Sequence, residues 1–214
     1  MSAEGGREGA ELRPRATTRI GAASPCNSSD ALPLLEEAFA NDRESRRNAG
    51  ANLVEAYAAT GRRDKAEALA ATLASQCRRD FRAETKDRAH WLGLLGDSLV
   101  AAKSFPEAEA SLREALAILN KVEPDGWLTP ATQARLGGAL LRRKSVAEAE
   151  PLLVKGFEGM KLREAKMAPR DRQRLVAAAA DLADLYAGLN KPELAAKWRA
   201  NAAALTAALR RKAN

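Results

Sequence analysis

The sequence predicts an all-α fold in which antiparallel helical hairpins stack into a solenoid. Three observations lead to this prediction. The 214 residues are 46% hydrophobic but only 4% aromatic, and the residues that favour strands are sparse whereas alanine is abundant. Small and large apolar residues recur at a fixed separation along most of the chain. Residues that end or begin helices stand between the recurring segments.

The recurring unit places an apolar residue, small in most copies, twelve positions before an alanine. Four copies occur, at Val54 and Ala66, Gly96 and Ala108, Gly137 and Ala149, and Ala183 and Ala195. The alanine therefore recurs after 42, 41 and 46 residues. Such a unit predicts a helical hairpin, because small residues on two facing helices let their backbones approach closely.

Turn and cap residues separate the two helices of each unit. Gly61 and Asn190 can adopt the left-handed conformation that ends a helix. Ser104 and Ser145 are each followed three positions later by a glutamate, which is the spacing of a capping box at the start of a second helix. The chain is therefore expected to form four hairpins, over residues 44–80, 82–121, 128–166 and 169–210.

Two segments precede the first predicted hairpin. Residues 30–43 contain ALPLLEEAF, which parallels AEPLLVKGF from Ala149, and they predict a lone second helix that caps the array. Residues 1–29 are rich in Gly, Ser and Arg and predict a disordered tail. An alternative is that the chain is the tail of something longer, or that it begins within a repeat array.

The spacing of small and large residues resembles the tetratricopeptide repeat (TPR). The usual period in that family is about 34 residues, and steps of 41 to 46 residues resemble the longer-helix variety found in kinesin light chains. The resemblance implies a right-handed superhelix whose concave wall is lined by the first helices. It also implies a non-catalytic module that binds a protein or peptide in this groove.

The segment from Trp127 onward carries a second resemblance. Its motifs LGG, AEAEPLL and AAKW resemble the C-terminal TPR region of large bacterial serine/threonine protein kinases. This implies a bacterial, kinase-linked signalling role, with a serine/threonine kinase as one candidate partner. The glycine-rich loop, HRD and DFG motifs of a kinase do not occur in the sequence, so we expect no enzyme. An alternative is a detached or truncated C-terminal segment of such a kinase.

The family resemblance places the partner-binding positions on the first helices. They are Asn48, Asn52 and Glu55 in the first unit, His90, Gly93 and Asp97 in the second, Arg135, Gly138 and Arg142 in the third, and Asp181 and Asp184 in the fourth. Arg135 and Arg142 are the expected cationic part of the groove, where a partner's carboxylate could accept bidentate hydrogen bonds. The Lys, Asn and Arg clamp of chaperone-binding members is not matched.

Glycines in the third unit raise the question of a phosphate-binding loop. The segments GLLGDS and LGGALL lack the strand-turn-helix context of such a loop, so packing is the favoured explanation. Gly137 is expected to face the alanine of its own second helix, and Gly156 to lie where the next hairpin stacks. Gly138 is expected to face the groove, where its bare backbone would admit a partner closely, and Gly159 has no explanation.

Other chemistry is not indicated. His90 is the only histidine, so any histidine-based triad would depend on it alone. Cys26 and Cys77 have neither metal-ligand nor redox spacing, so no metal or cofactor is expected and a reducing, cytoplasmic setting is the default. There is no apolar run long enough to span a membrane and no signal peptide.

The formal net charge of +7 raises nucleic acid as an alternative partner. The basic residues are scattered, however, and no stacking aromatic residues are interleaved with them. A nucleic-acid-binding helical repeat is therefore the less favoured alternative.

Overall fold

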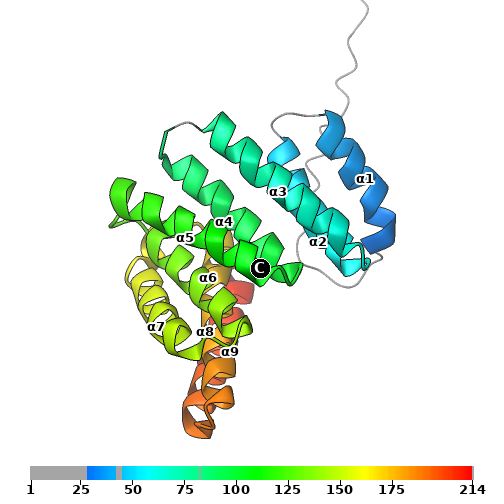
Figure 1. The fold of residues 1–214 in the computed structure, drawn as a ribbon. Helices are drawn as coiled ribbons and strands as arrows, with labels where there is room; N and C mark the ends of the chain where they lie inside the picture. Colours follow the sequence, from blue (N-terminus) through cyan, green and yellow to red (C-terminus); the bar gives the residue numbers. More distant parts are fainter. Residues whose placement is uncertain (1–27, 42–44, 82, 214) are drawn as a thin grey trace, which may run out of the picture.

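The computed structural model describes residues 28–41, 45–81 and 83–213, which form nine α-helices, two short 3-10 helices and no strand. The expected disorder of residues 1–29 falls almost entirely outside this part. The α-helices are α1 (Ser28–Asn41), α2 (Ser45–Ala59), α3 (Arg63–Asp80), α4 (Lys86–Ala101), α5 (Phe105–Val122), α6 (Leu128–Arg142), α7 (Val146–Leu162), α8 (Gln173–Gly188) and α9 (Pro192–Ala213) (Figure 1). The 3-10 helices η1 (Glu164–Lys166) and η2 (Pro169–Arg172) connect α7 to α8.

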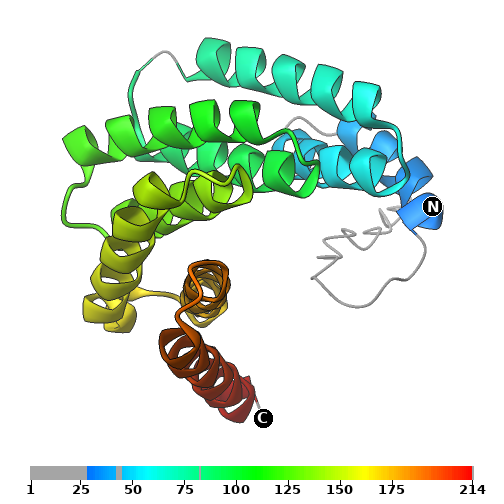
Figure 2. The same ribbon diagram turned by 60° about the horizontal axis from the view of Figure 1, so that its bottom comes forward.

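Four antiparallel hairpins, α2–α3, α4–α5, α6–α7 and α8–α9, stack one after another. The first helices contact one another, α2 with α4, α4 with α6 and α6 with α8, whereas the second helices make far fewer mutual contacts. The array therefore curves with its first helices on the inner side, as Figure 2 shows. The predicted all-α solenoid is confirmed.

The turns between first and second helices share one backbone conformation. Gly61 (φ 79°) and Asn190 (φ 56°) are left-handed as predicted, and Lys103 (φ 61°) and Lys144 (φ 64°) take the same conformation at the other two turns. In each turn the next N–H donates to a carbonyl five residues earlier, as from Ser104 to Leu99 at 2.9 Å. This six-to-one bond is that of a Schellman motif.

The predicted capping boxes at α5 and α7 do not form. Ser104 and Ser145 occupy the cap positions, but neither side chain makes a capping hydrogen bond. Their ψ angles of 66° and 62° follow from the tight turn before them, whereas a capping side chain needs an extended residue. Thr85 is extended (ψ 159°), and its side chain accepts a hydrogen bond from Arg88 N.

Helix ends differ from the expected bounds mainly around the α7–α8 connection. The helix α7 ends at Leu162 rather than at residue 166, and α8 begins at Gln173 rather than at 169. Pro169 explains the interruption, because the residue before a proline is pushed out of the helical region, and Ala168 is extended (ψ 149°). The helix α4 begins at Lys86, after its cap, and α9 continues to Ala213.

The helix α1 packs on α2 as a second helix packs on the first helix that follows it. The Tyr57 hydroxyl on α2 donates to Glu36 on α1 at 2.7 Å. The last hairpin makes the equivalent contact, in which the Tyr186 hydroxyl on α8 donates to Glu150 on α7 at 3.0 Å. None of the helices in the described ranges is long and apolar enough to cross a membrane.

The seam between α6 and α7 is built on glycine. A Cβ on Gly137 would lie 3.0 Å from Leu153 N and 3.1 Å from Ala149 O, which confirms that Gly137 faces its own second helix. A Cβ on Gly156 would lie 2.6 Å from Ala134 N. The prediction for Gly156 is therefore wrong, because this glycine faces α6 of its own hairpin and not the next one. Gly159 faces Pro130 of α6.

Candidate functional site

The inner face, formed by α2, α4, α6 and α8, carries the candidate binding residues. They are Asn48, Asn52 and Glu55 on α2, His90 and Asp97 on α4, Arg135, Gly138 and Arg142 on α6, and Asp181 and Asp184 on α8. The side chain of Asn48 lies outside the described part of the structure, and Asn52 is exposed. Three contacts between neighbouring first helices involve most of the others.

The first contact joins α2 to α4. The hydroxyl of Ser98, which is buried, donates to Glu55 Oε1 at 3.3 Å. Desolvation raises the pKa of the Glu55 carboxyl; the hydrogen bond from Ser98 opposes this shift and the negative charge of Asp97 adds to it.

The second contact joins α4 to α6 through a bidentate ion pair. Arg135 donates from Nε to Asp97 Oδ1 at 2.6 Å and from Nη2 to Oδ2 at 2.5 Å. Its guanidinium lies over Gly93, where any side chain would overlap Nη1. The Arg135 side chain is 8% exposed and that of Asp97 43% exposed. The arginine is thus held inside the inner face, and the carboxylate is left at its surface.

A third helix contributes Arg174, which the sequence analysis missed. Arg174 lies on α8, and its Nη1 is 3.6 Å from Asp97 Oδ2. Arg174 and Asp97 lie on hairpins that are not neighbours, since α6–α7 stands between them. The curvature of the array brings the two side chains together, and the repeat spacing does not predict this contact. Burial and the nearby charges of Arg135 and Arg174 lower the pKa of His90. The imidazole is therefore neutral at neutral pH.

The third contact joins α6 to α8 and corrects the expectation for Gly138. Arg142 donates to Gly138 O at 2.8 Å and to Asp181 Oδ1 at 3.0 Å. A Cβ on Gly138 would overlap the Asp181 carboxylate. The space over this glycine is therefore filled by the protein's own Asp181 and is not open to a partner. Burial, opposed by Arg142, raises the pKa of Asp181.

These contacts change the expected charge of the inner face. Arg135 and Arg142 were expected to receive a partner's carboxylate, but both already pair with carboxylates of this chain. Glu55 and Asp184 are exposed, and Asp97 is partly so. Arg142 is also exposed, at 42%, while its partner Asp181 is 16% exposed. Among the described candidate residues, three carboxylates and one guanidinium therefore reach the surface, so negative charge predominates. No cluster of three or more His, Cys, Asp or Glu residues that could hold a metal occurs within the described residues.

No protein-family model matches the chain, and no curated protein sequence does either. Solved structures do. The TPR-like repeats of a Podosopora anserina protein assigned as a kinesin light chain are 23% identical, with 86% of this chain and 89% of that chain covered. The TM-scores are 0.56 for the parent form and 0.58 for a single-residue variant.

A second solved structure is BtubC (BKLC) from P. vanneervenii. It is 19% identical, with a TM-score of 0.58, and the match covers 86% of this chain and 72% of that chain. At these identities the similarity establishes the fold alone. The TPR-like solenoid fold expected from the repeat is confirmed.

Proposed function

We propose that the chain is a non-catalytic interaction module that binds a protein or peptide segment along the inner face. The observation that carries this proposal is the distribution of exposure among the charged groups. Arg135 is 8% exposed, whereas Asp97 is 43% exposed and Glu55 and Asp184 are exposed. Arg142, at 42%, is the one exposed cation among the described candidate residues. The segment that fits this face presents basic side chains or amide donors, since Glu55, Asp97 and Asp184 leave acceptor oxygens at the surface.

The contacts across the inner face support a binding role as well as a structural one. Arg135 and Asp181 fill the spaces over Gly93 and Gly138 with the ends of flexible side chains, not with backbone. Such side chains can rearrange when a ligand arrives, because rotamer changes at an interface require little movement of the backbone.

The test is a selection of peptides from a random displayed library on the immobilised protein, followed by titration calorimetry of the selected sequences. We expect enrichment of Lys and Arg. Asp97→Asn and Asp184→Asn should each weaken binding by up to about fivefold, which is the range of an exposed charge pair.

The matched control is Glu158→Gln, which removes an exposed carboxylate from the second helix α7. It should leave the affinity unchanged. Selected peptides that are acidic, or that bind the Asp97→Asn and Glu158→Gln proteins equally well, would contradict the proposal.

The kinase-linked role stays a prediction that rests on the motifs from Trp127 onward. It is tested by co-purification of the chain with serine/threonine kinases of the native host. Retention of a kinase that is lost on Asp184→Asn but kept on Glu158→Gln would support it.

A further inference from the structure

A second surface lies at the end of the molecule where α7 meets α8 and α9. We call it the basic corner and define it as residues 161–174 together with Arg210 and Arg211. Residues 161–174 include six basic and two acidic residues. Because α9 runs antiparallel to α8, its last turns return to this connection and bring Arg210 and Arg211 beside it. The corner therefore concentrates positive charge that is scattered elsewhere.

Several cations of the basic corner have no acidic partner in the described part of the chain. Lys161 pairs with Glu164 at 2.7 Å, and Arg174 reaches Asp97. Arg163 and Arg170 make longer contacts, of 3.8 and 3.9 Å, with acidic residues. The remaining four, for which the described residues supply no ion pair, are Lys166, Arg172, Arg210 and Arg211.

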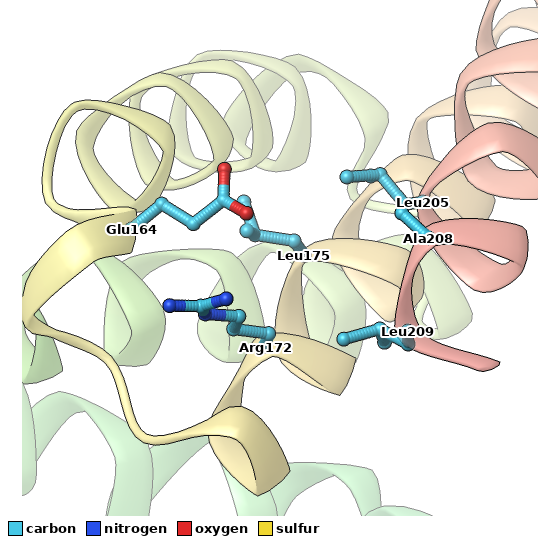
Figure 3. Close-up of a pocket in the computed structure, with 6 residues that line it drawn as sticks. All are labelled: Glu164, Arg172, Leu175, Leu205, Ala208 and Leu209. Carbon is cyan, nitrogen blue, oxygen red and sulfur yellow. The ribbon is translucent and has the colours of Figure 1, made fainter. Parts of the chain in front are cut away.

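A small pocket lies within the basic corner, between the α7–α8 connection and the last turns of α9 (Figure 3). Its lining consists of Glu164, Arg172, Leu175, Leu205, Ala208 and Leu209. Leu175 is fully buried, and Leu205 and Leu209 are partly buried. These residues and Ala208 make the apolar part of the lining, and Glu164 and Arg172 make its charged part. The Nε of Arg172 is buried and has no hydrogen-bond partner. An unsatisfied buried donor costs free energy that an acceptor on a bound molecule would restore.

We propose that the basic corner docks an acidic protein segment, with one aliphatic side chain of that segment in the pocket and its carboxylates against the four cations. Charge complementarity supplies the long-range attraction. The apolar pocket supplies the anchor, as a buried aliphatic contact does at the centre of protein interfaces. The exposed Leu162, with 84% of its surface free, adds apolar contact area beside the pocket.

A protein segment fits this surface better than nucleic acid or an anionic membrane. Single-stranded nucleic acid needs aromatic side chains on which its bases stack. On the adjoining helices α7 and α9, Phe157 and Trp198 pack edge-on against each other, with ring centroids 4.9 Å apart. A membrane surface would use the charge and Leu162, but it would leave the concave pocket without an occupant.

The experiment uses the full chain and a short fluorescein-labelled peptide of Asp and Glu with one central leucine, titrated by fluorescence anisotropy. Ala208→Leu fills the pocket and should weaken binding at least about tenfold. Ala207→Leu is the matched control, because Ala207 is the exposed neighbour on the same helix, and it should leave the affinity unchanged. Melting curves of both variants establish that they fold.

Two further comparisons separate the contribution of the cations to binding from that of the aliphatic side chain in the pocket. Arg172→Gln should weaken binding about tenfold, whereas Arg79→Gln, at an exposed arginine of α3, should not. The same peptide with serine in place of leucine should bind at least about tenfold more weakly. Asp184→Asn changes an inner-face residue that makes no ion pair with the basic corner in the described part of the chain. It should have no effect, so this site and the inner face fail or succeed independently.

Three results would overturn the proposal. One is equal affinity for the leucine and serine peptides. Another is binding that Ala208→Leu does not weaken. The third is tighter binding to phosphatidylserine vesicles or to single-stranded RNA than to the peptide, unaffected by Ala208→Leu, which would assign the basic corner to a membrane or to nucleic acid.

Discussion

The glycines of the α6–α7 seam and the glycines of the inner face are filled in different ways. At Gly137 and Gly156 the space that a side chain would take is bounded closely by backbone atoms of the facing helix, and at Gly137 also by the Leu153 side chain. At Gly93 and Gly138 it is occupied by the charged ends of Arg135 and Asp181, which come from the next hairpin.

The difference separates a rigid region from an adaptable one. Backbone in a close-packed seam cannot retreat without moving a helix, whereas a guanidinium or carboxylate moves by rotation about side-chain bonds. The seam therefore sets the geometry of each hairpin. The inner face sets how neighbouring hairpins meet, through side chains whose ends can rotate without moving a helix.

The largest effect is expected in the seam. Gly137→Leu places a branched side chain against Leu153 N and Ala149 O, so the two helices must separate. Overpacking of this kind costs about 3 kcal/mol, which corresponds to a fall in melting temperature of roughly 6–12 °C for a chain of this size. Differential scanning calorimetry without ligand measures it. A variant as stable as the parent would contradict the packing role of Gly137.

A single methyl group tests the same region more finely. Gly156→Ala should cost about 2 kcal/mol, because the new Cβ would lie 2.6 Å from Ala134 N and 2.8 Å from Pro130 O. Gly188→Ala is the matched control, since no atom lies within 4 Å of a Cβ there. It should stabilise the protein by about 0.5 kcal/mol through helix propensity. Urea unfolding measures the change in the free energy of unfolding for each variant. Equal changes would contradict the close packing at Gly156.

On the inner face a glycine-to-alanine substitution should cost less stability than in the seam. Its cost should depend on the side chain that faces the glycine. Gly138→Ala should cost about 1 kcal/mol, because the carboxylate of Asp181 must move. In an Asp181→Ala background only the flexible end of Arg142 remains close to the new Cβ, at 3.2 Å, so the substitution should instead stabilise by about 0.5–1 kcal/mol. Urea unfolding of the four proteins of this double-mutant cycle measures the coupling. Additive effects would show that the two residues do not compete for one space.

The smallest effect concerns pH. The folded-state pKa of Asp181 is raised, with burial as the largest cause, so the ionised carboxylate costs stability that is recovered as the pH falls through this pKa. Asp181→Asn should therefore be more stable than the parent at pH 7, by less than about 1 kcal/mol. The difference should shrink as the pH falls and disappear near pH 3, which lies below the ordinary Asp pKa of about 3.9, so that the carboxyl is largely protonated in both states. A difference of the opposite sign at pH 7 would mean that the pair with Arg142 outweighs burial.

Much of the fold follows from the period of small and large residues. Gly96 and Gly137 precede their alanines by twelve positions, and this separation is set within one hairpin by two helices and a turn. Left-handed Gly61 and Asn190 were predictable for the same local reason. Gly156 was assigned to the wrong neighbour, because a small residue on a helix does not itself say which of two adjacent helices it faces.

The site was less predictable, because it depends on how the hairpins are placed relative to one another. Arg135 was recognised as an inner-face residue, but its pairing with Asp97 depends on the stagger between α4 and α6. Arg174 reaches the same carboxylate from α8 only because the array curves. The accessible charge of the face could not be obtained from a list of its residues, since Arg135 and Asp181 are largely buried whereas the side chains of Asp97 and Arg142 are exposed.

The shared turn between first and second helices has a consequence for protein engineering. The left-handed backbone conformation occurs at the same place in all four turns, at Gly61, Lys103, Lys144 and Asn190. All four hairpins therefore use one turn conformation. Glycine adopts this conformation at no steric cost, whereas lysine does not. Lys103 and Lys144 are therefore the first positions for glycine in a stabilised scaffold.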